Sequence, residues 1–134
     1  MPQENAESIR RAVEAFNRGD ADAFVALAQP DVEWEDAVFW SERSKVFRGR
    51  AALRDWFAQV QEPWESIQIA VEEILEAGDD RLVVGLGLTA RGSGSGAETQ
   101  QRAWQVNWFI EGLTAKRRVF RDRDEALEAA GLSE

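Results

Sequence analysis

The stretch of sequence that decides the fold reads Asn17-Arg-Gly-Asp20, then Val32-Glu-Trp-Glu-Asp36, then Phe47-Arg-Gly-Arg50. In the first segment, Gly19 ends a helix and Asp20 caps the next one, because Asp accepts hydrogen bonds from free N–H groups at a helix start. In the second segment, apolar residues alternate with acids, which predicts a strand. The third segment leads into another helical pattern. Helix, short helix, strand and helix therefore open the chain.

The first and third of these helices show an apolar stripe with a spacing of three and four residues. The first helix carries its stripe up to Phe16, and the third is predicted from about Arg50 to Gln61. The second helix stops before Pro30. Residues 37–49 are predicted to form a loop or a short edge segment. The two stripes consist of Ala6, Ile9, Val13, Phe16, Leu53, Trp56, Phe57 and Val60.

After the third helix the pattern becomes that of strands. Residues 67–71 alternate between apolar and polar, and residues 82–88 are nearly all apolar, as in a central strand. Residues 104–110 alternate again, and a last strand is predicted to reach Phe120. A short final helix follows, with Asp124 as its predicted N-cap.

Three helices followed by a run of strands predict an α+β fold, with the helices gathered against an antiparallel sheet. We expect residues 1–134 to form one domain, since this length is enough to bury a substantial core. The expected shape is a cone, in which a curved sheet packs against the three N-terminal helices and encloses a hydrophobic pocket.

The composition excludes several kinds of chemistry. The chain has no Cys, His or Tyr, so it can form no disulfide, thiol nucleophile or histidine-based catalytic pair. Metal binding by adjacent carboxylates such as Glu33 with Glu35, or Glu72 with Glu73, is not expected, because such acids usually form a solvated face. We expect no metal and no cofactor. Acid–base chemistry, if present, depends on Asp, Glu or Lys.

The charge and hydropathy limit the partners. A net charge of −9 makes a nucleic-acid backbone a poor partner. No apolar stretch approaches the roughly 20 residues needed to cross a bilayer, and the start of the chain has no signal-peptide core. We therefore expect a cytoplasmic protein that binds neither nucleic acid nor membrane.

One acid is the strongest candidate for a functional side chain. Strand alternation places Asp36 on the same face as Val32 and Trp34, away from the two glutamates between them. A carboxylate beside aromatic rings can have a raised pKa and act as a base. The other interpretation is an exposed acid at a strand end.

The opposite wall of the pocket is predicted to come from Trp104, Val106 and Trp108. The amides of Gln105 and Asn107 are then expected to face solvent or a partner subunit. A register shift of one residue reverses this assignment and brings the amides into the pocket.

Taken together, these motifs resemble the SnoaL-like branch of the nuclear-transport-factor-2-like superfamily, which includes ketosteroid isomerases. The resemblance spans almost the whole chain and rests on the order and spacing of short motifs. These motifs are Asn17-Arg-Gly-Asp20, Ala26-Leu27, Val32-Glu-Trp-Glu-Asp36, Phe47-Arg-Gly-Arg50, Arg54-Asp-Trp-Phe57, Gly112, Val119-Phe-Arg-Asp122, Glu125-Ala-Leu127 and Ala130-Gly131.

The resemblance implies that Asp36 lies where ketosteroid isomerases carry the aspartate that moves a proton. The isomerases' oxyanion donors, a tyrosine and a protonated aspartic acid, do not carry over, since the matching positions are Ala12 and Val106. Each missing donor removes about 2.7–4 kcal/mol of transition-state stabilisation. Epoxide hydrolases and dehydratases of this fold use tyrosine or histidine, which this chain lacks.

Two classes of function remain open at this point. The first is a small enzyme of the isomerase, cyclase or dehydratase type that acts on a hydrophobic oxygenated molecule, with Asp36 as general base. The second is a non-catalytic module that binds a small molecule or pairs with itself. We favour a protein that binds a small hydrophobic oxygenated molecule. The resemblance implies a homodimer formed through the sheet, with Phe109, Ile67 and Ile69 as candidate interface residues. The predicted ligand-binding residues are Trp34, Trp40, Trp56, Trp104, Val106, Trp108 and Phe120.

Overall fold

The computed structural model describes residues 2–36, 45–92, 94, 96–120 and 122–132. This part of the chain forms four helices and six strands. The helices are α1 (Pro2–Arg18), α2 (Ala21–Ala26), α3 (Arg50–Gln61) and α4 (Arg123–Ala129). The strands are β1 (Ala28–Asp36), β2 (Lys45–Arg48), β3 (Trp64–Glu76), β4 (Arg81–Gly92), β5 (Glu98–Ile110) and β6 (Leu113–Phe120).

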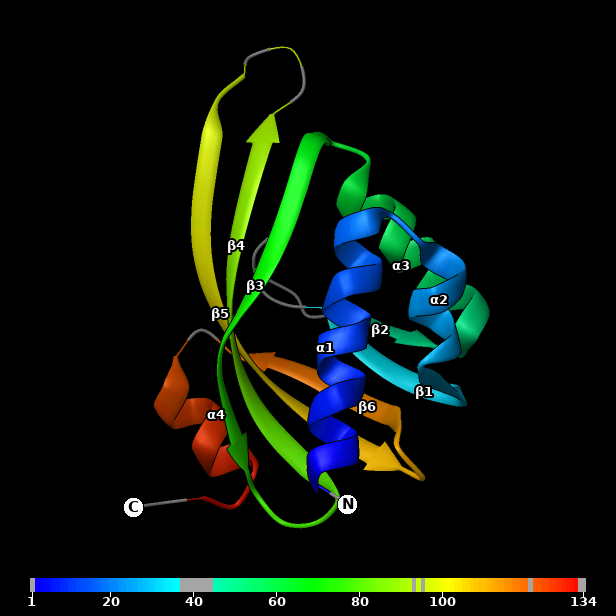
Figure 1. The fold of residues 1–134 in the computed structure, drawn as a ribbon, viewed down its shortest axis with the longest axis vertical. Helices are drawn as coiled ribbons and strands as arrows, with labels where there is room; N and C mark the ends of the chain where they lie inside the picture. The colour runs from blue at the N-terminus through cyan, green and yellow to red at the C-terminus, as the bar shows by residue number, and fades with distance from the viewer. Residues whose placement is uncertain (1, 37–44, 93, 95, 121, 133–134) are drawn as a thin grey trace.

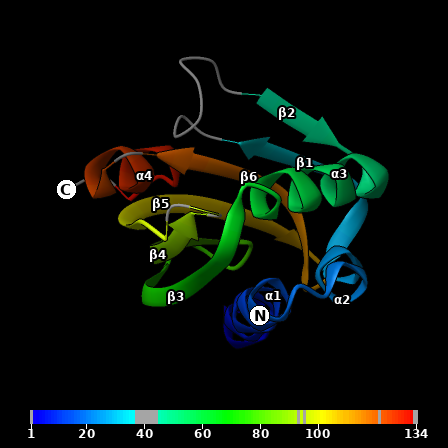
Figure 2. The ribbon, with the colours of Figure 1, turned by 90° about the horizontal axis from the view of Figure 1, so that it is seen from above.

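The strands form a single curved sheet in the order β2-β1-β6-β5-β4-β3. Neighbouring strands are antiparallel except for β1 and β6, which run parallel. Helices α1, α2 and α3 lie against one face of this sheet and α4 lies against the other (Figure 1). Seen from above, the sheet curls between β2 and β3, and α1 and α3 lie within the curl (Figure 2). We call the face toward α1–α3 the inner face and the face toward α4 the outer face.

The α+β class and the three helices packed against a curved sheet are confirmed. The helix predicted from about Arg50 to Gln61 has these bounds in the structure, and its predicted stripe is buried. The sheet is mixed rather than purely antiparallel, because β1 pairs with β6 in parallel. β1 begins at Ala28, earlier than predicted, and includes Pro30.

The Asn17-Arg-Gly-Asp20 motif joins the first two helices to the sheet. Asn17 Nδ2 donates to the carbonyl of Ile69 at 2.9 Å, and its Oδ1 accepts from the N–H of Ile69 at 2.8 Å. Gly19 adopts a φ of 71°, a left-handed conformation that Gly tolerates best. Asp20 caps α2 by accepting from the N–H of Ala23 at 3.1 Å, and this hydrogen bond lowers the pKa of Asp20.

The final helix covers part of the outer face. Its N-cap is Asp122, which accepts from the N–H of Glu125 at 2.8 Å, so the prediction of Asp124 as the cap was wrong. Because Asp122 lies two residues earlier, the helix takes in Asp124 as part of its first turn. The predicted stop at Gly131 is present: its φ is 85°, and the next N–H, that of Leu132, donates to Leu127 at 2.7 Å.

Candidate functional site

Buried polar side chains mark the inner face of β5 and β6. Gln105 and Asn107 on β5, and Thr114 and Arg117 on β6, are each less than 9% exposed. Polar side chains are seldom buried this far in an apolar core unless they have partners or a function. The inner face of these two strands is therefore the first place to look for a site.

These side chains belong to a row that crosses three strands. Trp34 on β1 lies opposite Arg117 on β6, and Arg117 lies opposite Asn107 on β5. Directly opposed residues on neighbouring strands have side chains in contact range. The sheet thus places an indole, a guanidinium and an amide side by side beneath the helices.

Arg117 lies against two tryptophan rings that also contact each other. Its guanidinium carbon lies 4.0 Å from the ring centroid of Trp34 and 5.1 Å from that of Trp56. Arg117 Nη2 also donates to the carbonyl of Glu35 at 2.9 Å. Cation–π contacts of this kind become stronger when the cation is shielded from water, and Arg117 is only 7% exposed.

The rings around this row form one cluster drawn from four elements. Phe16 comes from α1, Phe24 from α2, Trp34 from β1, and Trp56 and Phe57 from α3. Their ring centroids lie between 5.0 and 6.3 Å apart, in tilted, edge-on and stacked arrangements. The cluster fixes the three helices to the sheet and supplies an aromatic wall.

Between the helices and the polar row lies a cavity with two lobes. The volume of the first lobe is about 50 Å³ and that of the second is about 70 Å³, counted as the space that the centre of a water molecule can occupy. One water needs roughly 10–15 Å³ by this measure, so each lobe holds more than one. Both lobes are lined by Phe16, Trp56, Ile69, Leu86, Gln105 and Arg117.

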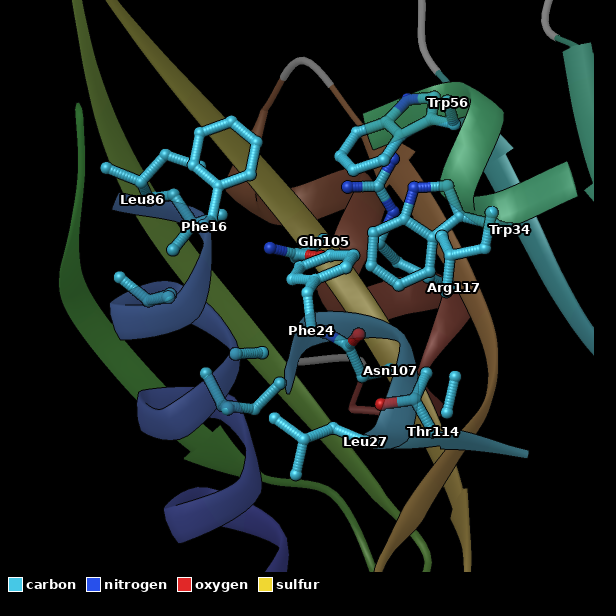
Figure 3. Close-up of a pocket in the computed structure, with 16 residues that line it drawn as sticks. Phe16, Phe24, Leu27, Trp34, Trp56, Leu86, Gln105, Asn107, Thr114 and Arg117 are labelled. Atoms are coloured by element: carbon cyan, nitrogen blue, oxygen red, sulfur yellow. The ribbon is translucent and has the colours of Figure 1, made fainter. Parts of the chain in front are cut away.

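The first lobe has an apolar wall and a polar wall. Helices α1 and α2 contribute apolar side chains, Phe16 and Phe24 among them, whereas the sheet contributes the buried polar residues. Trp34, Trp56 and Arg117 lie at one end of this lobe, and Leu27 and Thr114 lie at the other (Figure 3). A molecule with one apolar and one polar side matches these walls.

Three polar atoms at this site have no hydrogen-bond partner among the described residues: Trp34 Nε1, Trp56 Nε1 and Asn107 Nδ2. All three are buried, and all three are donors. Buried donors are normally satisfied, and leaving one unpaired destabilises the folded state. These three donors are therefore left without an acceptor from the described protein atoms.

The structure brings some of the predicted site residues together. Trp34 and Trp56 line the cavity, although their role in binding remains a prediction. Asp36 is the last residue of β1, with its backbone paired to Lys45; its side chain is outside the described part of the structure. Trp40 lies outside the described residues.

The predicted opposite wall was assigned to the wrong face. Trp104, Val106, Trp108 and Phe120 belong to the outer face, where they pack with α4 residues such as Leu127. The reason is that alternation shows which residues of a strand share a face, but not which face is the inner one. Both faces of β5 are covered from Trp104 to Phe109, and the amides of this segment enter the cavity.

The candidate interface residues also prove to be interior. Phe109 is 5% exposed and packs beneath α1 with Ile9, and Ile67 is 6% exposed. Ile69 is partly buried and lines both lobes of the cavity. Phe109 and Ile67 are therefore unsuited to a subunit interface.

The acids considered as a metal site lie beside guanidinium groups instead. Glu33 pairs with Arg48, Glu35 with Arg118, Glu72 with Arg102 and Glu73 with Arg123, at distances of 3.1 to 3.5 Å. Within the described residues, no group of three acids is placed to hold a metal ion. None of the described helices is both long enough and apolar enough to span a bilayer.

The sequence profile of the SnoaL-like domain matches residues 9–117, and the chain belongs to this family. No curated protein matches the sequence. The matched range runs from within α1 to within β6, and it contains every residue that lines the first lobe of the cavity.

Solved structures of low sequence identity share the fold. An NTF2-like protein of unknown function from Burkholderia pseudomallei is 22% identical, with a TM-score of 0.77 and coverage of 93% of this chain and 95% of that one. The epoxide hydrolase/cyclase-like enzyme SalBIII is 23% identical, with a TM-score of 0.77 and coverage of 91% and 95%. RV0760c from Mycobacterium tuberculosis, solved with estradiol-17β-hemisuccinate, is 17% identical, with a TM-score of 0.75 and coverage of 90% and 95%.

Proposed function

We propose that this protein binds a small hydrophobic oxygenated molecule in the cavity between α1–α3 and the sheet. The observation that carries the proposal is the pairing of an apolar helical wall with a buried polar row on β5 and β6. Ligand sites are typically apolar cavities with a few polar groups that orient the ligand. Two relatives in fold, an epoxide hydrolase/cyclase-like enzyme and a protein solved with a steroid ester, support this class of ligand.

Catalysis by Asp36 is the alternative within the same site. Arg117 donates to the carbonyl of Glu35, so the backbone of the next residue, Asp36, lies close to the polar row. In an isomerase, cyclase or dehydratase, Asp36 is the candidate general base. Ala12 lines the cavity without offering a donor, whereas Asn107, the neighbour of the outward-facing Val106, brings an amide into it.

A non-catalytic dimerisation module is the remaining alternative. It requires a surface other than Phe109 and Ile67, because these two side chains are buried, whereas Ile69 is only partly buried. Sedimentation velocity at micromolar concentration tests it directly: a monomer eliminates this alternative.

The test of binding is a Trp-fluorescence titration of the wild type and Asp36→Asn with single-ring ketones, carboxylates and terpenoids, at pH 5 and pH 8. We expect saturable quenching in the wild type. Asp31→Asn is the matched control, since Asp31 lies on the same strand and is exposed. A flat response across the panel would overturn the proposal.

Measuring the turnover of whichever compound binds then distinguishes an enzyme from a binding protein. Loss of turnover in Asp36→Asn with binding retained supports an enzyme. A gain in stability in Asp36→Asn, with binding unchanged and no turnover in either protein, supports a binding protein that holds an acid beside an apolar pocket.

A further inference from the structure

The unpaired donors of the cavity specify the polar group of its ligand. Trp34 Nε1 and Trp56 Nε1 can only donate, so no rotation of either ring turns them into acceptors. Asn107 is 2% exposed, and its Nδ2 adds a third donor on the same face. An oxygen that accepts hydrogen bonds satisfies such positions, whereas a ligand N–H at the same place would face other donors.

The guanidinium of Arg117 at this end of the cavity also favours an acceptor oxygen. The Arg117 guanidinium lies against the rings of Trp34 and Trp56 and is the register partner of Asn107. A guanidinium can only donate hydrogen bonds, as an indole N–H can, so the polar groups at this end of the cavity favour an oxygen that carries negative charge or a large dipole. They disfavour an amine or ammonium group.

The size of the cavity limits the rest of the molecule. The two lobes provide about 50 and 70 Å³. For comparison, an engineered cavity of about 150 Å³ in another protein binds benzene. Each lobe alone is smaller than that cavity, so a single ring needs the space of both lobes, and a steroid-sized ligand requires Phe16 or Trp56 to move.

We propose that the cavity selects a single-ring molecule whose polar group only accepts hydrogen bonds, a ketone or carboxylate, oriented by the Trp34 and Trp56 indole N–H groups and Asn107. This inference rests on the proposed function and names the ligand class of that site. The ring lies against α1 and α2, and the sp² oxygen lies over the row formed by Trp34, Arg117 and Asn107.

The test compares probes of similar size by isothermal titration calorimetry: acetophenone and benzoate as acceptors, toluene without a polar group, and benzylamine as a cationic donor. We expect the better acceptor to bind at least about tenfold more tightly than toluene, which corresponds to one well-made buried hydrogen bond. Benzylamine is expected to bind more weakly than toluene. Tighter binding of benzoate identifies a carboxylate ligand, and tighter binding of acetophenone a ketone.

Matched variants locate the donors. Asn107→Leu and Trp34→Phe remove an N–H from the inner face, so each is expected to reduce the preference for the acceptor over toluene about tenfold. Trp108→Phe removes an indole N–H from the outer face and is expected to leave the preference unchanged. If Asn107→Leu does not fold, Trp34→Phe alone tests whether an inner-face donor sets the preference for the acceptor.

The two proposals fail in distinguishable ways. Toluene binding as tightly as acetophenone and benzoate, or benzylamine binding best, would overturn the acceptor preference and leave an apolar ligand site in place. A preference that persists in Trp34→Phe and Asn107→Leu would overturn the assignment of the donors. The absence of binding by all four probes would overturn both the acceptor preference and the proposed function.

Discussion

From Trp104 to Phe109 the two faces of strand β5 are both covered, yet they are packed differently. On the outer face, Trp104, Val106 and Trp108 meet the apolar side of α4. On the inner face, Gln105 and Asn107 are buried beneath α1–α3 beside a cavity. One strand therefore contributes to a filled apolar cluster on one side and to an unfilled polar site on the other.

The difference separates residues that only pack the fold from residues that line the candidate site. The outer face is so close-packed that a Cβ atom on Gly85 would lie 2.5 Å from a ring carbon of Trp104. The inner face retains empty space, and the donors of Trp34 and Asn107 have no partner among the described residues. Selection for stability alone favours filling such space and pairing such donors, and the proposed binding function gives a reason for keeping both.

The largest expected effect comes from the aromatic cluster of the inner face. Trp56→Ala removes a ring that is 6% exposed and contacts Phe16, Phe24 and Trp34, so we expect a loss of about 3–5 kcal/mol in the free energy of unfolding. Trp108→Ala is the comparison on the outer face. Trp108 is only partly buried, so a smaller loss is expected.

Urea denaturation of both Trp56→Ala and Trp108→Ala measures the difference. Equal losses would mean that the helices α1–α3 depend no more on their aromatic cluster than α4 does on its own. The two faces of the sheet would then contribute alike to the stability of the fold, despite their different packing.

A smaller effect tests the close packing of the outer face. Gly85→Ala places a methyl group against the Trp104 ring, and we expect overpacking to destabilise the fold by about 1–3 kcal/mol. Gly87→Ala is the matched control two residues along β4. There the nearest atom, at 3.0 Å, is the Oε2 of Glu72, the end of a flexible side chain that can move aside.

Thermal unfolding followed by circular dichroism distinguishes the two glycine variants. Gly87→Ala is expected to change the melting temperature little, because Ala also restricts the unfolded chain. If Gly87→Ala proved as damaging as Gly85→Ala, the loss would reflect the strand backbone rather than the packing of Trp104.

Local sequence patterns predicted the helices and strands better than they predicted the residues of the candidate site. Helical spacing and the Gly and Asp at the helix ends correctly predicted α3 and the cap at Asp20, because these signals depend on neighbouring residues. The parallel pairing of β1 with β6 joins segments far apart in the chain, and no local pattern encodes it. The sheet was therefore predicted as antiparallel.

Predicting the site residues required knowing which face of β5 is the inner one, and alternation does not show this. The pattern from 104 to 110 separates two sets of residues but does not say which set faces α1–α3. The large rings of Trp104 and Trp108 favoured the wrong set, because α4 also requires an apolar face to cover. The signal that was available was Gly85: a glycine gap opposite Trp104 accommodates that ring on the outer face.

The smallest expected effect tells most about the inner face, because the change in the free energy of unfolding is expected to have opposite signs at two asparagines with the same exposure. Asn107 and Asn5 are each 2% exposed. Asn5 Nδ2 donates to the carbonyl of Asp79 at 3.1 Å, although Asn5 Oδ1 has no donor among the described residues, whereas Asn107 Nδ2 has no acceptor among them. We expect Asn107→Leu to raise the free energy of unfolding by about 1 kcal/mol, because it removes an unpaired buried donor.

Asn5→Leu is expected to lower the free energy of unfolding, since it leaves the Asp79 carbonyl without its partner. Urea denaturation of both variants, without ligand, measures the two signs. A loss in both would show that Asn107 contributes to the fold as Asn5 does, and the polar row would then be structural. Opposite signs, with acceptor binding lost only in Asn107→Leu, would show that this side chain is kept for a ligand at the expense of stability.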